Sequence, residues 1–193
     1  MLIGKSGPAK SALCHAEADR IDVRGRDLCR DLMGQLSFTE FFFLLVTGRE
    51  ATAEQSFFLD LLLVAIAEHG LTPSAQVARV TYAAAPDSLQ GAVAAGILGA
   101  GPVILGAAEA CAGVLVEARR RIAAGMAPDE AVAAMAAERK AAGARMPGFG
   151  HPVHHPADPR AERILELADA RGVSGQHVDL ARRFAGAVEA AWG

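Results

Sequence analysis

The residues best suited to binding or catalysis lie together between positions 145 and 160. The sequence there is Arg-Met-Pro-Gly-Phe-Gly-His-Pro-Val-His-His-Pro-Ala-Asp-Pro-Arg. This segment holds three histidines, two arginines and one aspartate, with glycines and prolines between them. Histidine can donate a hydrogen bond or move a proton near neutral pH, and arginine presents a planar fork that suits a carboxylate. The backbone at Gly148 and Gly150 has no Cβ to keep a ligand away. The segment therefore predicts a site for a small carboxylate-bearing anion.

A metal site is the first alternative for the same segment. His151, His154, His155 and Asp158 are all acceptable zinc ligands. However, two prolines among them restrict how the loop can fold around one ion, and the spacing lacks the helix-borne His-Glu-x-x-His arrangement. We therefore expect no bound metal and keep a zinc site as the alternative.

Helix signals flank this segment and fill most of the chain. Ser37 with Glu40, and Thr52 with Gln55, have the spacing of capping boxes ahead of apolar runs. No stretch alternates with the period of two that a strand requires, so the fold class is predicted to be all-α. A helical pattern also follows Asp27. The other helices are predicted from Ser37 to Gly48, from Thr52 to Gly70, and at about 73–84, 89–100, 106–123, 128–142, 158–172 and 178–192.

Composition supports closely packed helices and excludes one class of partner. Hydrophobic residues make up 52% of the 193 residues and aromatic residues only 5%, so Ala, Leu and Val dominate. The net charge is −3, with both signs scattered along the chain. Because no basic stripe is present, we expect no nucleic-acid partner.

Cysteine usage and hydropathy predict a cytoplasmic protein. The three cysteines are far apart and lack CxxC spacing, so neither a disulfide framework nor a thiolate zinc site is expected. No secretory signal is evident at the N-terminus. Residues 89–116 contain a single charged residue, Glu109, and this run is long enough for a membrane span. This run is dominated by Ala and Gly and contains Pro102, so we expect a buried core or a subunit interface and no membrane partner.

Three segments resemble the citrate synthase and citryl-CoA lyase family, in the family's order. Pro147-Gly-Phe-Gly-His151 followed by Asp158-Pro-Arg160 resembles its active-site loop. Residues 21–49 resemble its early helices, and residues 68–79 resemble the segment in which a histidine at a helix end binds the dicarboxylate. The resemblance covers roughly residues 21–172. It implies a citrate-synthase-like helical fold, with large-domain helices over 1–110 and a small-domain portion over 111–193.

The resemblance also implies roles for individual residues. His151 is expected to donate to the ketone oxygen of oxaloacetate, while His69 and Arg160 are expected to bind carboxylates. Without the family, a lone histidine beside a glycine, such as His69, is more often a capping or surface residue, and Arg160 could equally make a local contact in the first turn of its helix. The backbone that is expected to contact the CoA adenine comprises Met146, Pro147, Gly148, Phe149 and Gly150.

Two departures from the family pattern bear on activity. Where citrate synthases have a histidine that donates to the thioester carbonyl, this chain has Ile104. The citryl-CoA lyase module of ATP-citrate lyase likewise lacks that histidine, so the loss favours the lyase branch. The family's general-base aspartate lies beyond the point where this chain ends, at Gly193, and neither Asp179 nor Glu189 matches its motif. We therefore expect a chain incomplete at its C-terminal end, or a truncated relative with weak or no turnover.

Together these features predict a citryl-CoA lyase-like enzyme that cleaves or forms the bond between acetyl-CoA and oxaloacetate. Citrate synthase activity and a non-catalytic CoA-binding protein are the alternatives. The expected ligands are a CoA thioester and a dicarboxylate, both as substrates, with no permanently bound cofactor. A homodimer through the Ala- and Gly-rich residues 89–100 is also expected from the family.

Overall fold

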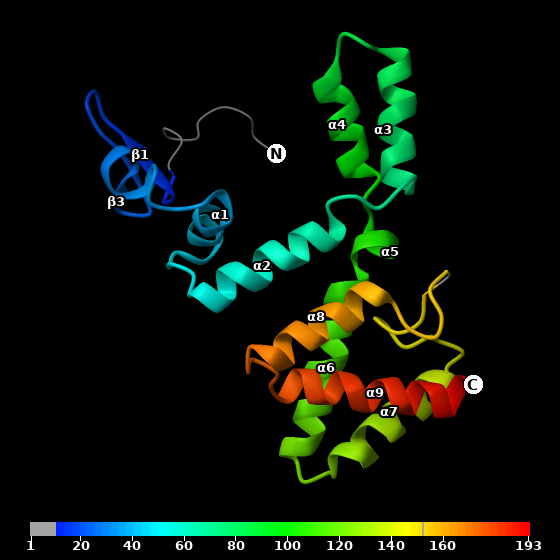
Figure 1. Cartoon of the computed structure of the whole chain (residues 1–193). Helices are drawn as coiled ribbons and strands as arrows, with labels where there is room; N and C mark the ends of the chain where they lie inside the picture. Colours follow the sequence, from blue (N-terminus) through cyan, green and yellow to red (C-terminus); the bar gives the residue numbers. More distant parts are fainter. Residues whose placement is uncertain (1–10, 152) are drawn as a thin grey trace, which may run out of the picture. The chain divides into compact units, whose positions relative to one another are not determined.

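The structure, a computed structural model, describes residues 11–151 and 153–193, except for the side chains of residues 103 and 104. The chain divides into two compact units, Met1–Glu68 and His69–Gly193. The described residues form mainly helices, which confirms the all-α prediction (Figure 1). The division predicted at residues 110 and 111 refers to family-type domains and stays a prediction.

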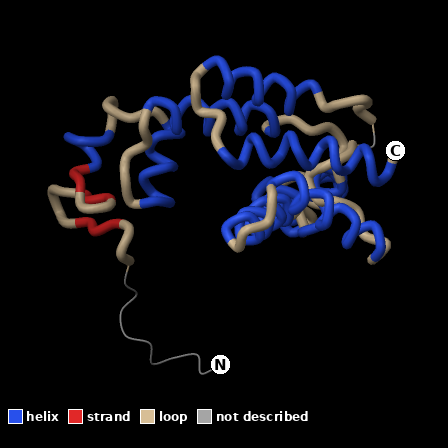
Figure 2. The backbone as a smooth tube through the Cα atoms, turned by 90° about the horizontal axis from the view of Figure 1, so that it is seen from below, coloured by secondary structure: helices blue, strands red, loops and turns tan. Residues whose placement is uncertain are grey.

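The first unit opens with a small antiparallel sheet that the sequence did not predict. Its strands β1, β2 and β3 lie in this order, at Cys14–Ala16, Ile21–Val23 and Arg26–Asp27 (Figure 2). Arg24 and Gly25 join β2 to β3 with φ values of +51° and +78°, which are typical of a two-residue hairpin turn. Strands of two or three residues are too short to show an alternating pattern, so periodicity could not reveal them.

Helices α1 (Phe38–Thr47) and α2 (Ala53–Ile66) follow a short π-helix at Leu28–Leu32. Both predicted capping boxes are present, with the Ser37 and Thr52 hydroxyls accepting from the backbone of Glu40 and Gln55. This unit has its own small core, which consists of Val23, Leu32 and Leu44, with Leu28, Leu36, Phe41 and Leu45 packed around it.

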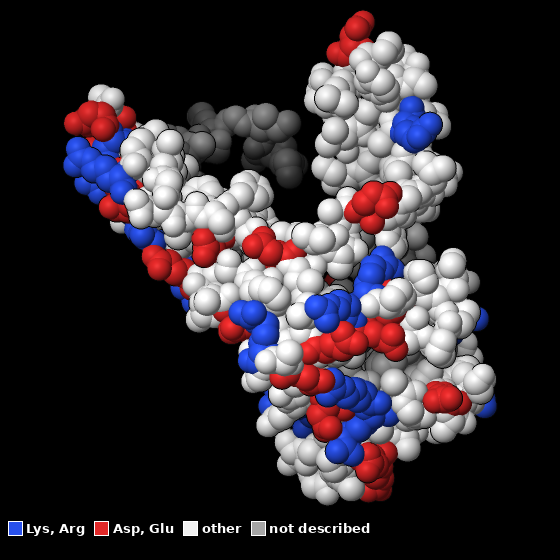
Figure 3. Space-filling view, viewed as in Figure 1, with Lys and Arg blue, Asp and Glu red and all other residues white. Residues whose placement is uncertain are grey.

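The second unit begins with a hairpin of two helices, α3 (Pro73–Ala84) and α4 (Leu89–Leu98), which pack on each other. Glycines allow the close approach: a Cβ on Gly96 would lie 3.2 Å from the Cβ of Ala78, and one on Gly99 would lie 3.1 Å from the Cα of Ser74. Figure 3 shows few charged side chains on the visible face of this hairpin, whereas the surface over α6–α9 carries both signs.

The rest of the second unit surrounds the larger core. Its helices are α5 (Pro102–Leu105), α6 (Ala107–Ala123), α7 (Pro128–Ala141), α8 (Pro159–Ala170) and α9 (Gln176–Trp192). Helices α6, α7 and α9 pack on one another. Phe184 of α9 is fully buried at the centre, beside Val114, Ala118, Val132, Met135, Ala136, Met146 and Leu180. In the part of the chain that is described, no helix is both long and apolar enough to cross a bilayer.

Candidate active site

Residues 146–150, the segment expected from the resemblance to contact the CoA adenine and named the coenzyme loop for that expectation, are anchored to the larger core at two points. The Met146 side chain is 3% exposed and belongs to that core. Phe149 packs against the same core, with its ring centroid 6.0 Å from that of Phe184. Burial of these two side chains fixes the loop by the hydrophobic effect. The backbone of Gly148 and Gly150 stays exposed, so a ligand can reach it.

The two glycines of the coenzyme loop have different surroundings. Both have positive φ, +82° at Gly148 and +84° at Gly150, a conformation that favours glycine. A Cβ on Gly150 would meet nothing within 4 Å, whereas one on Gly148 would lie 2.5 Å from the Sγ of Cys111. Gly150 therefore leaves room for a ligand, and Gly148 allows the loop to lie against α6.

His151 follows the coenzyme loop, and its tautomer is fixed by the backbone. Its Nδ1 accepts hydrogen bonds from the backbone N–H of Val153, at 3.1 Å, and of His154, at 3.0 Å. A ring nitrogen that accepts carries no proton, so the proton of the neutral ring is on Nε2. Burial, and then the nearby His154, lower the pKa of His151 below its usual value of 6.5. His151 is thus a neutral ring that presents an Nε2–H donor.

Arg160 connects the loop region to a distant part of the sequence. Its Nε and Nη2 donate to the Asp158 carboxylate at 3.0 and 2.6 Å, and its Nη1 lies 3.1 Å from the Nδ1 of His69. Because a guanidinium can only donate, His69 Nδ1 accepts and its proton is on Nε2. The predicted carboxylate-binding pair, His69 and Arg160, is therefore in direct contact across 91 positions of the sequence.

Asp158 fixes the position of Arg160. It is the N-cap of α8, and its Oδ1 also accepts from the backbone N–H of Arg160 at 2.9 Å. The Arg160 guanidinium holds the pKa of Asp158 well below its usual range. This pairing is the local contact in the first turn of the helix that the sequence left open as the alternative for Arg160. Side-chain partners two residues apart at a helix start have no distinctive sequence signal.

The charges of this cluster also reach His151. Asp158 favours the protonated form of the His151 ring, whereas Arg160 and His69 disfavour it. The His151 and His154 rings stack with centroids 4.4 Å apart. Two Nε2–H donors and a guanidinium thus belong to one cluster, and such a set can bind a carboxylate and stabilise a negative oxygen.

The structure also bears on the zinc alternative. Ligand atoms of His151, His154 and Asp158 lie within 4.8 Å of one another, and His155 does not belong to this group. Both carboxylate oxygens of Asp158 already accept from Arg160, and His151 Nδ1 already accepts two backbone N–H groups. A metal ion would have to compete with Arg160 for the carboxylate. The geometry therefore favours hydrogen bonding to an anionic ligand.

Ile104, which the resemblance matches to the family's thioester-binding histidine, lies in α5. Its side chain is outside the described part of the structure. Cys111 had no predicted role, because its contact with Gly148 depends on a distance that no motif encodes.

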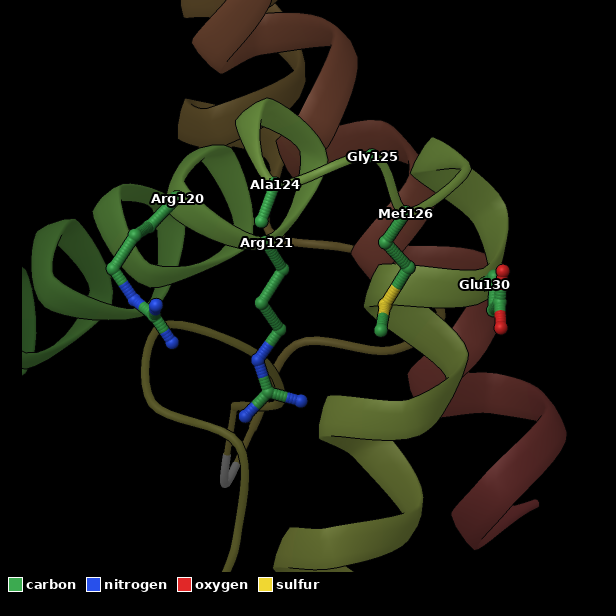
Figure 4. A pocket seen from close by; sticks show the side chains of 6 residues that line it. All are labelled: Arg120, Arg121, Ala124, Gly125, Met126 and Glu130. Carbon is green, nitrogen blue, oxygen red and sulfur yellow. The ribbon is translucent and has the colours of Figure 1, made fainter.

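A shallow hollow lies elsewhere in this unit, at the turn between α6 and α7. Figure 4 shows Arg120 and Arg121 on α6, with Met126 and Glu130 beyond the turn. Arg120 is paired with Glu117, and Arg121 with both Glu117 and Glu138. Because both guanidinium groups already have carboxylate partners, this hollow is a poor site for an anionic substrate.

Comparison with known proteins agrees with the family resemblance of the sequence. The family profile "Citrate synthase, C-terminal domain" matches residues 8–192. The structure of citryl-CoA lyase from Hydrogenobacter thermophilus is similar, with a TM-score of 0.80 and 27% identity over 95% of this chain and 69% of that chain. No curated protein matches significantly.

Two ATP citrate lyase structures are similar in fold. The enzyme from Methanothrix soehngenii, in complex with citrate and coenzyme A, has a TM-score of 0.79 and 23% identity over 99% of this chain and 30% of that chain. A mutant of the Methanosaeta concilii enzyme, in complex with (3S)-citryl-CoA, has a TM-score of 0.77 and 23% identity over the same shares.

Proposed function

This chain belongs to the citrate synthase family, and on that premise we propose that it is a citryl-CoA lyase-like enzyme. Its substrates would be a CoA thioester and a dicarboxylate, with no permanently bound cofactor. The observation that carries the proposal is the tautomer of His151, which leaves an Nε2–H donor on a ring that interacts electrostatically with Arg160 and His69, the proposed carboxylate-binding pair. A cytoplasmic location stays a prediction from the sequence.

The proposed reaction is a retro-Claisen cleavage of citryl-CoA. The hydroxyl oxygen passes its proton to solvent water and becomes the ketone oxygen of oxaloacetate. The carbon–carbon bond breaks at the same time, and its electron pair passes to the thioester as an enolate. Water returns a proton to the enolate carbon to give acetyl-CoA, so the overall reaction neither consumes nor releases a proton. His151 Nε2–H donates to the reacting oxygen while it carries negative charge, which stabilises the transition state.

His69 and Arg160 bind the carboxylates of the same substrate in this proposal. Asp158 occupies the Nε side of the guanidinium, and His69 Nδ1 accepts from Nη1. Each terminal nitrogen of a guanidinium carries two N–H groups, so one on Nη1 and one on Nη2 remain for a carboxylate. His69 adds its Nε2–H, and its side chain is exposed, so it can reach a ligand.

The coenzyme loop provides the surface for the CoA thioester. Support comes from the open space at Gly150 and from the two anchors, the buried Met146 and the partly buried Phe149. A backbone that is already ordered loses little conformational entropy when a ligand binds. The similar structure that was solved with citrate and coenzyme A agrees with this ligand class.

A second copy of the chain is the proposed macromolecular partner. The exposed face of α4 carries Leu89, Val93 and Ile97 at four-residue spacing, with exposed fractions of 64%, 53% and 70%. Such spacing gives one apolar stripe on the helix. Gly96 and Gly99 face α3 instead, so the larger apolar side chains would form the dimer contact.

The test is the substitution His151→Ala in the purified chain. Citryl-CoA is offered, and the release of oxaloacetate is followed by its reduction in a coupled NADH-dependent reaction. We expect turnover to fall at least about a hundredfold because the oxyanion donor is lost. His155→Ala is the matched control: His155 is exposed and lies outside the cluster.

The outcomes separate the alternatives. An unchanged rate in His151→Ala refutes the role of His151. No turnover by the folded wild-type chain, with CoA binding retained, selects the non-catalytic CoA-binding protein. The same His151 donor could serve both directions of the reaction, so the two rates are compared. If the chain forms citrate from acetyl-CoA and oxaloacetate faster than it cleaves citryl-CoA, the result selects citrate synthase.

A further inference from the structure

The Cys111 side chain lies under the middle of the coenzyme loop. Cys111 is in the second turn of α6, and a Cβ on Gly148 would lie 2.5 Å from its Sγ and 2.8 Å from its Cβ. Real Cβ atoms do not approach other heavy atoms so closely. The backbone at Gly148 therefore lies directly against this side chain, with no space between them.

The loop cannot easily move away from this contact. Met146, two residues before Gly148, is buried in the core, and Phe149 follows directly and packs on the same core. These anchors on both sides fix the backbone at Gly148 against α6. The size of the side chain at position 111 therefore sets how far the exposed surface of the loop stands from the helix.

The thiol is suited to such a packing role. Burial raises the pKa of Cys111 above its usual value, so it remains a neutral thiol near neutral pH. A neutral thiol behaves as a small hydrophobic group. Cys14 and Cys29, the other cysteines, are exposed.

We propose that Cys111 is a positioning residue for CoA binding, which acts through Gly148 by fixing the height of the coenzyme loop. The proposal rests on the proposed function, because that function assigns the loop to the CoA thioester. It predicts that a change at Cys111 alters the affinity for CoA but not the affinity for the dicarboxylate, which in the proposed function binds at His69 and Arg160.

The first test is Cys111→Leu, measured by calorimetric titration of the purified chain with CoA and, separately, with oxaloacetate. The larger side chain should push Gly148 outward and weaken CoA binding about tenfold or more. Oxaloacetate affinity should stay within about twofold, since the carboxylate-binding side chains are supported by Asp158 rather than by Cys111. Cys29→Leu, at an exposed cysteine, is the matched control and should change neither affinity.

A double-mutant cycle between Gly148→Ala and Cys111→Gly tests the contact itself. Gly148→Ala alone should weaken CoA binding, because its Cβ would collide with the thiol. Cys111→Gly removes the Sγ and Cβ atoms with which the new Cβ would collide and leaves the Cα at 4.0 Å, an ordinary contact distance, so it should recover part of that loss. Pairs in contact deviate from additivity, whereas independent sites add. If Cys111→Leu does not fold, this cycle decides the question.

The outcomes separate this inference from the proposed function. Wild-type chain that binds neither CoA nor oxaloacetate overturns the proposed function and this inference with it. Wild-type chain that binds both ligands, with CoA affinity unchanged by Cys111→Leu or with strictly additive losses in the cycle, overturns the role of Cys111 alone. An equal loss of both affinities indicates general damage to the fold and also overturns it.

Discussion

Met146 offers a direct test of how the coenzyme loop is attached to the core. Its side chain is 3% exposed and packs with core residues of α6, α7 and α9. Met146→Ala removes three side-chain atoms beyond Cβ, and at about 0.8 kcal/mol per buried methylene this costs about 2 kcal/mol. The cavity left behind adds to this value, and measured Met→Ala substitutions in cores cost about 2–5 kcal/mol. The loop can partly collapse into the space, so we expect a loss of about 2–3 kcal/mol.

Trp192 allows the loss of unfolding free energy to be measured in the second unit, which contains Met146. It is the single tryptophan of the chain and lies in α9, which packs against α7 in the second unit. Urea unfolding followed by its fluorescence therefore reports the unit that contains Met146. Calorimetric titration with CoA on the same samples shows whether loosening the loop also weakens coenzyme binding, as we expect.

The matched control is Met33→Ala, because Met33 is 62% exposed and lies in the other unit. Exposed substitutions of this kind usually change stability by no more than about 0.5 kcal/mol. If Met146→Ala were as stable as Met33→Ala, the buried side chain of Met146 would contribute nothing to stability, and it could not be the anchor of the coenzyme loop.

Three further predictions concern the site and the assembly. Asp158→Asn should weaken oxaloacetate binding about tenfold with CoA binding retained, because Arg160 loses its charged partner; equal titration curves for variant and wild type would refute this. Turnover should persist through the usual histidine pKa of about 6.5 and fall only at lower pH, since the neutral form of His151 is the active one and burial lowers its pKa in the folded chain. A pH–rate profile without an acidic limb would contradict this prediction for turnover. The same pKa shift means that His151 contributes fully to the stability of the folded chain above its unfolded pKa, and that this contribution is lost as the pH falls through its folded pKa. Ile97→Asp should convert a dimer to a monomer in sedimentation, whereas Val116→Asp, at an exposed site on α6, should not; a monomeric wild-type chain at micromolar concentration would exclude the interface.

Helix starts were the most predictable part of the fold, whereas the predicted end of the helix from Thr52 to Gly70 was wrong: α2 ends at Ile66, so His69 lies in the loop that follows and not at the helix end. Ser37 and Thr52 begin α1 and α2 with both partners of each capping box in place, and Asp158 with Pro159 begins α8. These signals are local, because each depends on residues within one turn. The short helix α5 and the three strands were missed. They contain too few residues for a period to be visible, and the hairpin turn at Arg24 and Gly25 lacks the Asn-Gly signal.

The site was less predictable than the helices. His69 and Arg160 were placed in one site through the family resemblance, and their contact at 3.1 Å agrees with that interpretation. The support that Cys111 gives to Gly148 was not predicted, because this contact depends on three-dimensional positions that no spacing in the sequence encodes. The pairing of Asp158 with Arg160 is instead a local contact in the first turn of α8, which the sequence left open as the alternative role of Arg160. The roles of these residues toward a ligand stay predictions.

The two backbone donors to His151 have a consequence for how this region can change over evolution. The orientation of the ring depends on peptide N–H groups at positions 153 and 154, and every amino acid except proline supplies that group. The side chain at Val153, which is 73% exposed, is therefore free to drift among homologues without disturbing the imidazole. A proline at position 153 would remove the backbone N–H that donates to His151, although every recognisable motif of the loop would remain.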